Sequence, residues 1–149
     1  FNFRGVGKSV GNFDDGEGEL SDAASVLDWL QQYNTNSKIV WVAGFSFGAW
    51  VAMQLLMRRP EINGFVSVSP PANLRDFSFL SPCPSSGLIV HGDKDNIASF
   101  DSSKILSEKL QKQKKQNIIF KSIKGADHFY ENYKDQFTET VNNYIKEQF

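Results

Sequence analysis

Short apolar runs alternate along the chain with longer segments of helical period, and this alternation restricts the possible folds more than any other feature of the sequence. Several of the short runs are apolar at consecutive positions, which is typical of strands buried on both faces of a sheet. The pattern therefore indicates a parallel sheet covered by helices on its two faces. The predicted strands are residues 1–4, 39–43, 65–68, 88–91 and 118–123.

The longer segments differ in how their apolar residues are distributed. Two of them place these residues on one helical face and are predicted to pack on the sheet. The first holds Ala23, Val26, Leu27, Leu30 and Tyr33, and the second holds Tyr130, Tyr133, Phe137, Val141, Tyr144 and Ile145. Segment 49–56 is apolar on most sides and ends before Pro60, which predicts a deeply buried helix. A weaker, lysine-rich helix is predicted over 102–115, and the proline-rich loop 69–86 is too short to be a lid domain.

Length, charge and cysteine content exclude several classes of protein. The 149 residues, 40% of them hydrophobic, have the length of one ordinary domain, which we assign to residues 1–149. A net charge of -1 provides no overall electrostatic attraction to nucleic acid or anionic lipid. No apolar run approaches the roughly 20 residues of a membrane span. The single cysteine, Cys83, cannot form a disulfide within the chain. We therefore expect a soluble, cytoplasmic protein that binds neither nucleic acid nor membrane and needs no metal or cofactor.

The pentapeptide Gly44-Phe45-Ser46-Phe47-Gly48 directly follows a predicted strand and precedes the predicted buried helix. It matches the G-x-S-x-G pattern, in which the serine occupies a sharp, strained turn that projects its hydroxyl above the sheet. The two glycines let the strand and helix backbones approach each other, and the helix N-terminus faces a developing oxyanion. A serine that merely caps the helix is the alternative interpretation. The context favours Ser46 as a nucleophile.

A serine hydroxyl reacts only when a base accepts its proton, and the chain contains two histidines, His91 and His128. In folds with this elbow, the partners follow in the order serine, acid, histidine. His128 fits that order because it lies in the loop after the last predicted strand. His91 ends an earlier strand and is predicted to be structural.

Three carboxylates compete for the role of the acid that orients His128. Asp93 and Asp95 both follow the predicted strand 88–91, and on physical grounds alone they are nearly equal, although Asp93 is also placed to cap the turn. Asp127 ranks last, since a sequence neighbour rarely points at the same imidazole face.

The run His91-Gly92-Asp93-Lys94-Asp95 resembles the HGxxD loop of α/β hydrolases, and this resemblance selects Asp95 as the acid. Residues 1–9 resemble the RGxGxS turn that follows the fourth strand in many of these enzymes. They also contain the end of a P-loop pattern, but asparagine stands at position 2, where that pattern requires glycine. Segments 1–19 and 69–84 are similar to a group of small bacterial α/β hydrolases without a lid. The sequence departs from that group at 96–99, where an apolar-apolar-Pro continuation is usual.

The resemblance implies a three-layer α/β-hydrolase fold with a mostly parallel sheet, from which this sequence lacks the first three strands and the first helix. In this superfamily the third strand lies between the fourth and the fifth, so we expect residues 1–4 and 39–43 to be about two strand spacings apart and not to pair. One oxyanion donor would be the amide of Phe47, and the other would come from the loop after the absent third strand. We therefore expect the chain alone to be a poor enzyme.

The expected activity is that of a serine hydrolase acting on small-molecule carboxylic esters or thioesters. Ser46 would form an acyl-enzyme, His128 would transfer the proton and Asp95 would orient His128. A small peptidase or amidase with the same three residues is one alternative. A non-catalytic binding domain that keeps the elbow for packing is another.

Overall fold

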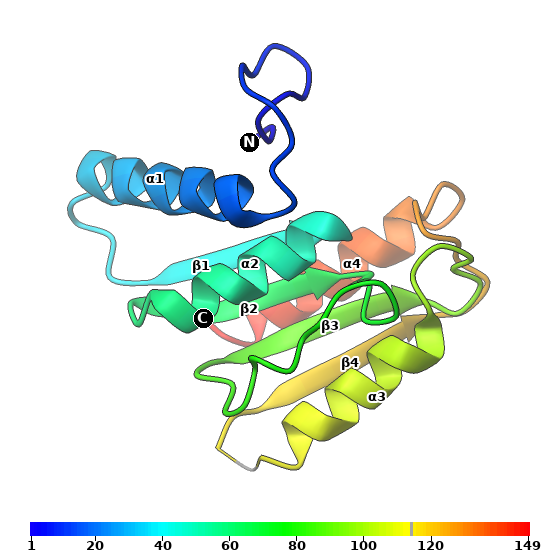
Figure 1. Cartoon of the computed structure of the whole chain (residues 1–149). Helices are drawn as coiled ribbons and strands as arrows, with labels where there is room; N and C mark the ends of the chain where they lie inside the picture. The colour runs from blue at the N-terminus through cyan, green and yellow to red at the C-terminus, as the bar shows by residue number, and fades with distance from the viewer. Residues whose placement is uncertain (114) are drawn as a thin grey trace.

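The computed structural model of the chain is built around a parallel sheet of four strands in chain order, and it describes residues 1–113 and 115–149. Each pair of neighbouring strands is parallel, so the carboxyl ends of all four lie at the same edge, on the right in Figure 1. The strands are β1 (Val40–Phe45), β2 (Ile62–Val68), β3 (Ser86–Gly92) and β4 (Ile118–Ile123).

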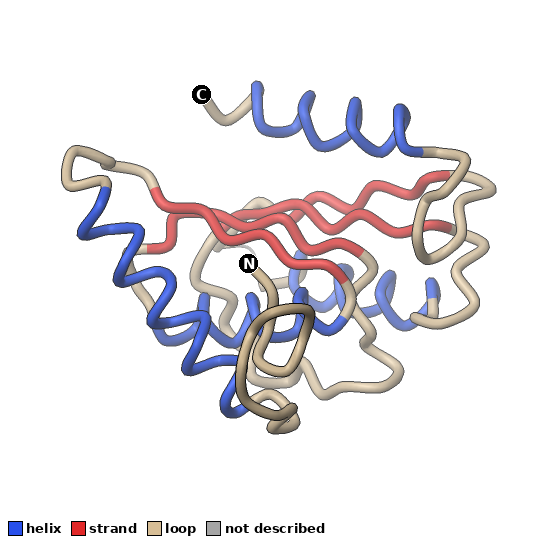
Figure 2. Tube along the Cα trace, turned by 90° about the horizontal axis from the view of Figure 1, so that it is seen from above, coloured by secondary structure: helices blue, strands red, loops and turns tan. Residues whose placement is uncertain are grey.

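Helices cover both faces of this sheet, as Figure 2 shows. The helices α1 (Glu17–Tyr33), α2 (Phe47–Arg58) and α3 (Phe100–Gln111) lie on one face, and α4 (Lys134–Lys146) lies on the other. The predicted three-layer α/β architecture with a parallel sheet is thereby confirmed.

The core consists of one buried cluster on each face of the sheet. Phe65 faces the cluster beneath α1, α2 and α3, whereas its neighbour Val66 faces the cluster beneath α4. Successive side chains of a strand point to opposite faces, so a strand between two helical layers must be apolar at consecutive positions. This explains the continuous apolar runs of the sequence.

Four of the five predicted strands are present, the strand 118–123 with its predicted bounds and the other three with ends shifted by up to three residues, but the prediction of a strand over residues 1–4 was wrong. This segment leads into turns in which Val6 N–H donates to Phe3 O and both Gly5 and Gly7 have positive φ angles, 71° and 61°. The alternating Phe-x-Phe pattern suggested a strand, but a strand needs a neighbour to complete its hydrogen bonds. No described ladder joins this segment to β1, and the expected separation of two strand spacings stays a prediction.

Two predicted helices begin or end elsewhere than expected. The C-terminal helix begins at Lys134, because Tyr130 has a φ of 56° and Tyr133 is the residue before the first turn. Both tyrosines still pack with α4 against the sheet. Helix α3 ends at Gln111, and Lys114 of the predicted 102–115 helix lies outside the described residues.

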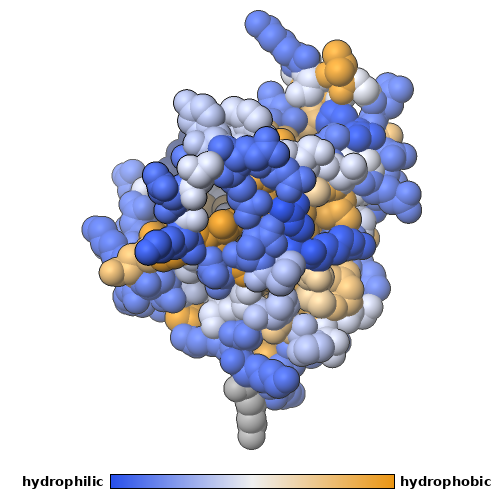
Figure 3. Space-filling model, turned by 90° about the vertical axis from the view of Figure 1, so that its left-hand side faces the viewer, coloured by the Kyte–Doolittle hydropathy of each residue, from blue (hydrophilic) through white to orange (hydrophobic). Residues whose placement is uncertain are grey.

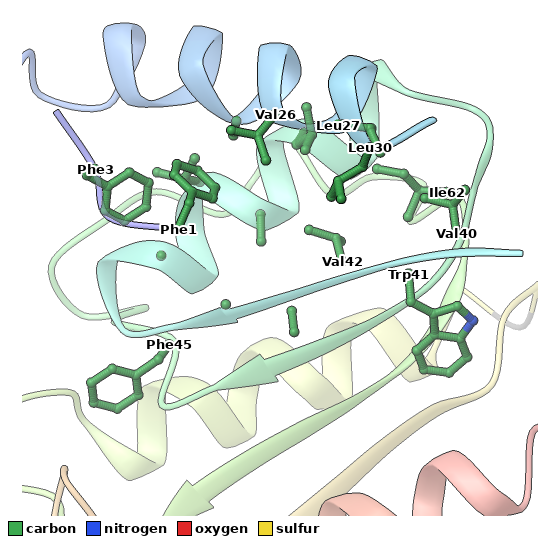
Figure 4. A pocket seen from close by; sticks show the side chains of 17 residues that line it. Phe1, Phe3, Val26, Leu27, Leu30, Val40, Trp41, Val42, Phe45 and Ile62 are labelled. Atoms are coloured by element: carbon green, nitrogen blue, oxygen red, sulfur yellow. The ribbon is translucent and has the colours of Figure 1, made fainter. Parts of the chain in front are cut away.

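A cavity of about 360 Å³ lies between α1, α2 and the free edge of β1. Val26, Leu27 and Leu30 of α1 point into it from one side, and Val42 of β1 points into it from the other (Figure 4). Phe1 also lines it. The N-terminal segment and β1 therefore face each other across an apolar space.

The exterior carries no single dominant apolar face on the side drawn in Figure 3, where hydrophilic residues surround small hydrophobic groups. Among the described residues, no helix is both long and apolar enough to cross a bilayer.

Candidate active site

Ser46 occupies the sharp turn between β1 and α2. Its backbone has φ 53° and ψ -119°, a strained conformation for a residue with a side chain. Its amide N–H donates to Val68 O of the neighbouring strand at 2.8 Å, which fixes the turn against the sheet. The hydroxyl makes no capping hydrogen bond to α2, so helix capping does not account for a serine at this position.

Gly44 is required by the close approach of strand and helix. A Cβ atom at this position would lie 2.2 Å from the carbonyl oxygen of Gly48, far inside any contact distance. A Cβ at Gly48 itself would meet Phe3 at 3.6 Å, an ordinary contact. The expectation that both glycines relieve a clash therefore holds for Gly44 but not for Gly48.

His128 lies in the loop after β4, and its side chain is almost fully buried. Nε2 of the imidazole is 3.0 Å from Oγ of Ser46, and Nδ1 is 2.7 Å from Oδ2 of Asp95. The structure thus brings together the three residues that the sequence placed in the site. With the Nδ1 proton directed at Asp95, Nε2 is free to accept the proton of the Ser46 hydroxyl.

Asp95 is held by donors on both of its oxygens, and its side chain has no exposed surface. Oδ1 accepts the backbone N–H groups of Ile97 and Ala98, each at 2.9 Å, while Oδ2 faces His128. Burial opposes ionisation, but the hydrogen bonds from His128 and the two amides outweigh it and hold the pKa of Asp95 below its usual range. The residues at 96–99, where the sequence departs from the family pattern, thus supply two of its donors.

The two other carboxylates considered for this role point elsewhere. Oδ1 of Asp93 accepts the N–H of Gly125 at 2.6 Å, a bond that joins the loop after β3 to the loop after β4. Oδ1 of Asp127 faces the N–H of Glu131 at 3.4 Å. Only Asp95 contacts the imidazole of His128 among these three carboxylates.

His91 is fully buried and contacts Asp95, a contact that was not predicted from the sequence. Its Nε2 lies 3.0 Å from Ala98 O and 3.2 Å from Oδ2 of Asp95. Both neighbours are acceptors, so Nε2 carries the proton, and burial lowers the pKa of His91, which keeps the ring neutral. The i, i+4 spacing of His91 and Asp95 at the end of a strand was the available signal.

The loops that carry Asp95 and His128 are in close backbone contact. Lys94 N–H donates to Ala126 O at 3.0 Å, and a Cβ at Gly92 would lie 2.3 Å from that same oxygen. Only glycine fits at position 92, which allows the two loops to approach until carboxylate and imidazole meet.

A buried hydrogen bond between Ser69 and Tyr130 supports the same region, and no sequence pattern indicates it. The two hydroxyl oxygens are 2.8 Å apart, and both residues have positive φ angles, 46° and 56°. Burial raises the pKa of Tyr130 to about 12, so its hydroxyl stays protonated. Because Tyr130 lies two positions after His128, this bond restrains the loop that carries the imidazole.

Phe47 is the first residue of α2, and its amide lies at a helix terminus where N–H groups have no intrahelical acceptor. Its ring packs against Phe3 and Trp50, and the guanidinium of Arg75 lies over both rings, 5.6 Å from the Phe47 centroid and 4.8 Å from that of Trp50. These contacts hold the start of α2 in place.

Among the described residues, no cluster of His, Cys, Asp or Glu has the arrangement of a metal site.

Comparison with known proteins places the chain in a family. Residues 1–148 match the family described as X-Pro dipeptidyl-peptidase (S15 family). An uncharacterised protein of Rickettsia prowazekii is 52% identical over 148 residues, which are 97% of this chain and 62% of that protein. The chain therefore spans less than two thirds of the length of this relative.

Solved structures show the same fold. A protein of unknown function from Agrobacterium tumefaciens, proposed to be an α/β hydrolase, has a TM-score of 0.96 and 52% identity, covering 99% of this chain and 67% of its own. XC6422 from Xanthomonas campestris, an α/β serine hydrolase without a lid, has a TM-score of 0.85 and 29% identity, covering 99% and 64%. The chain belongs to the S15 peptidase family and has the fold of the α/β serine hydrolases.

Proposed function

We propose that the chain carries the catalytic residues of a serine hydrolase that acts on carboxylic esters or thioesters. The observation that supports this most directly is the row of hydrogen bonds from Ser46 Oγ through His128 to Asp95, with distances of 3.0 and 2.7 Å. A nucleophile, a base and an orienting acid in this order are the groups that acyl transfer requires.

In the proposed mechanism, Ser46 Oγ attacks the carbonyl carbon of the substrate while His128 Nε2 accepts the hydroxyl proton. The negative charge on the carbonyl oxygen faces the amide of Phe47 at the positive end of α2. His128 then donates its proton to the leaving oxygen or sulfur, and the acyl group stays on Ser46. Water attacks this acyl-enzyme with His128 again acting as base, and the acid is released.

Ser46→Ala tests this proposal in the protein expressed from its complete reading frame. Hydrolysis of a short-chain p-nitrophenyl ester should be lost, while thermal unfolding stays cooperative. Ser25→Ala is a matched control, because Ser25 is an exposed residue of α1 and its hydroxyl donates to Ser21 O. Turnover by Ser46→Ala equal to that of the parent would contradict the proposal.

A peptidase with the same residues is the second candidate, and the S15 family match favours it. Esters have better leaving groups than amides, so we place esters first. A panel that compares an X-Pro anilide with p-nitrophenyl esters separates the two. Labelling by a fluorophosphonate distinguishes both from a non-catalytic domain, since only an activated serine reacts.

The proposal includes a single domain over residues 1–149 and a cytoplasmic location. The two core clusters on opposite faces of one sheet support the single domain. Cys83 is unpaired and buried, which is compatible with a reducing compartment. Cell fractionation tests the location.

A further inference from the structure

Two exposed aromatic rings flank the imidazole of His128. The ring centroid of Phe45 is 4.9 Å from that of His128, and the ring centroid of Phe129 is 5.1 Å from it, in an edge-on arrangement. The two phenylalanine rings are themselves 6.1 Å apart. They therefore form a small apolar surface, which we name the Phe45–Phe129 platform, directly beside the buried base.

The folded core does not account for this platform. Phe45 is 41% exposed and Phe129 is 58% exposed, and neither ring belongs to the core cluster on either face of the sheet. Phe45 also borders the cavity beside β1, where Figure 4 shows it at the carboxyl end of the strand. Phe129 does not line that cavity, so the cavity alone does not explain why two rings converge on His128.

The chemistry of acyl transfer determines which part of a substrate lies over these rings. When Ser46 Oγ bonds to the carbonyl carbon, the oxyanion faces the amide at the start of α2. The leaving oxygen must lie within hydrogen-bond reach of Nε2 of His128, because that nitrogen supplies its proton. The group attached to the leaving oxygen is therefore the part of the substrate nearest to His128 and its two aromatic neighbours.

We propose that the Phe45–Phe129 platform is the subsite for an apolar leaving group, so that the preferred substrates are esters of alkyl or aryl alcohols. This inference rests on the proposed function. In the step concerned, the bond from Ser46 Oγ to the acyl carbon forms and the bond from that carbon to the alcohol oxygen breaks. The serine proton passes through His128 to the departing alcohol, which leaves across the two rings.

The size of the expected effect follows from partial burial of the alcohol chain. Complete burial of one methylene corresponds to about a fourfold gain in affinity, and an open surface that covers one side of the chain gives about twofold. Ethyl, butyl and hexyl acetate share one acyl group and nearly one leaving-group basicity. We expect kcat/KM of the protein from its complete reading frame to rise about 16-fold from ethyl to hexyl acetate.

Phe129→Ala should reduce this rise to about fourfold, because it removes one of the two rings and with it about half of the effect per methylene. The mirror series of ethyl acetate, ethyl butanoate and ethyl hexanoate varies the acyl group instead, and its slope should not change in Phe129→Ala. Phe129→Leu keeps an apolar side chain and should retain an intermediate slope. Phe149→Ala is the matched control, since that ring is 70% exposed and contacts Trp41.

Each outcome decides for or against the subsite. A flat series in the parent, or a full slope in a folded Phe129→Ala, would overturn it. Equal losses in the alcohol and acyl series would assign the platform to general packing instead. Fluorophosphonate labelling separates this failure from failure of the proposed function: a labelled Ser46 with a flat alcohol series overturns the subsite alone, and an unlabelled protein overturns both.

Discussion

Replacing Asp95 by asparagine keeps the shape of this buried side chain, but it removes the negative charge and changes which hydrogen-bond roles are available. The carboxylate accepts from Ile97 and Ala98 on one oxygen and from His128 on the other, where His91 also lies at 3.2 Å. An asparagine has one accepting oxygen and one donating NH2 group. Facing the NH2 group toward the two backbone amides would leave both without their acceptor, and for the amide of the buried residue Ala98 this costs about 1 to 3 kcal/mol.

The carbonyl of asparagine should therefore face the backbone amides, so that its NH2 group points at Nδ1 of His128. The imidazole must then carry its proton on Nε2, where it donates to Ser46 and can no longer accept the serine proton. The corresponding substitution in a serine protease lowers kcat by about 10⁴-fold for this reason. We expect a loss of similar size for Asp95→Asn, measured with p-nitrophenyl acetate at neutral pH.

Asp93→Asn is the matched control in the same loop. Asp93 accepts a single N–H, from Gly125, and an amide oxygen can replace the carboxylate there. We expect its kcat to stay within about threefold of the parent, since the bond to Gly125 is retained. An Asp95→Asn variant within tenfold of the parent, or an equal loss in Asp93→Asn, would refute the assignment of the acid.

Three further predictions concern stability. Tyr130→Phe leaves the buried hydroxyl of Ser69 without its partner and should lower the free energy of unfolding in urea by about 1 to 3 kcal/mol; an unchanged midpoint would contradict this. Gly44→Ala should fail to reach the native fold, shown by loss of a cooperative thermal transition, because its Cβ would meet Gly48 O at 2.2 Å. The folded-state pKa of Asp95 is lowered, so its contribution is present above the ordinary carboxyl value of about 3.9 and is lost as pH falls through the folded value. The difference in unfolding free energy between the parent and Asp95→Asn should therefore shrink on acidification below that value. A difference that grows instead would contradict a lowered pKa of Asp95 in the folded state.

The architecture, and the order of the serine, the acid and the histidine along the chain, could be predicted from sequence because each depends on local patterns. Consecutive apolar residues mark strands buried on both faces, and the G-x-S-x-G pentapeptide marks a turn between a strand and a buried helix. Parallel strands deliver their carboxyl ends to one edge, so Ser46, Asp95 and His128 could be expected to converge there. Residues 1–4 show the limit of the pattern, because alternation indicates a strand only where a neighbouring strand can pair with it.

The contacts that select among similar side chains depend on tertiary geometry. Asp93 and Asp95 differ only in which loop atoms they reach, and resemblance to a family, not spacing, separated them. The approach of His91 to Asp95 and the bond between Ser69 and Tyr130 join residues whose side-chain directions depend on left-handed backbone angles and buried loops. No periodicity encodes such directions.

Three residues with side chains and positive φ angles lie at the carboxyl edge of the sheet, namely Ser46, Ser69 and Tyr130. Such conformations cost about 1 to 3 kcal/mol each. Glycine adopts positive φ angles without this cost. Laboratory evolution that selects only for thermal stability should therefore accept glycine at position 46 early, giving a protein that is more stable but lacks the proposed nucleophile. Retaining a hydroxyl there requires selection for turnover in every round.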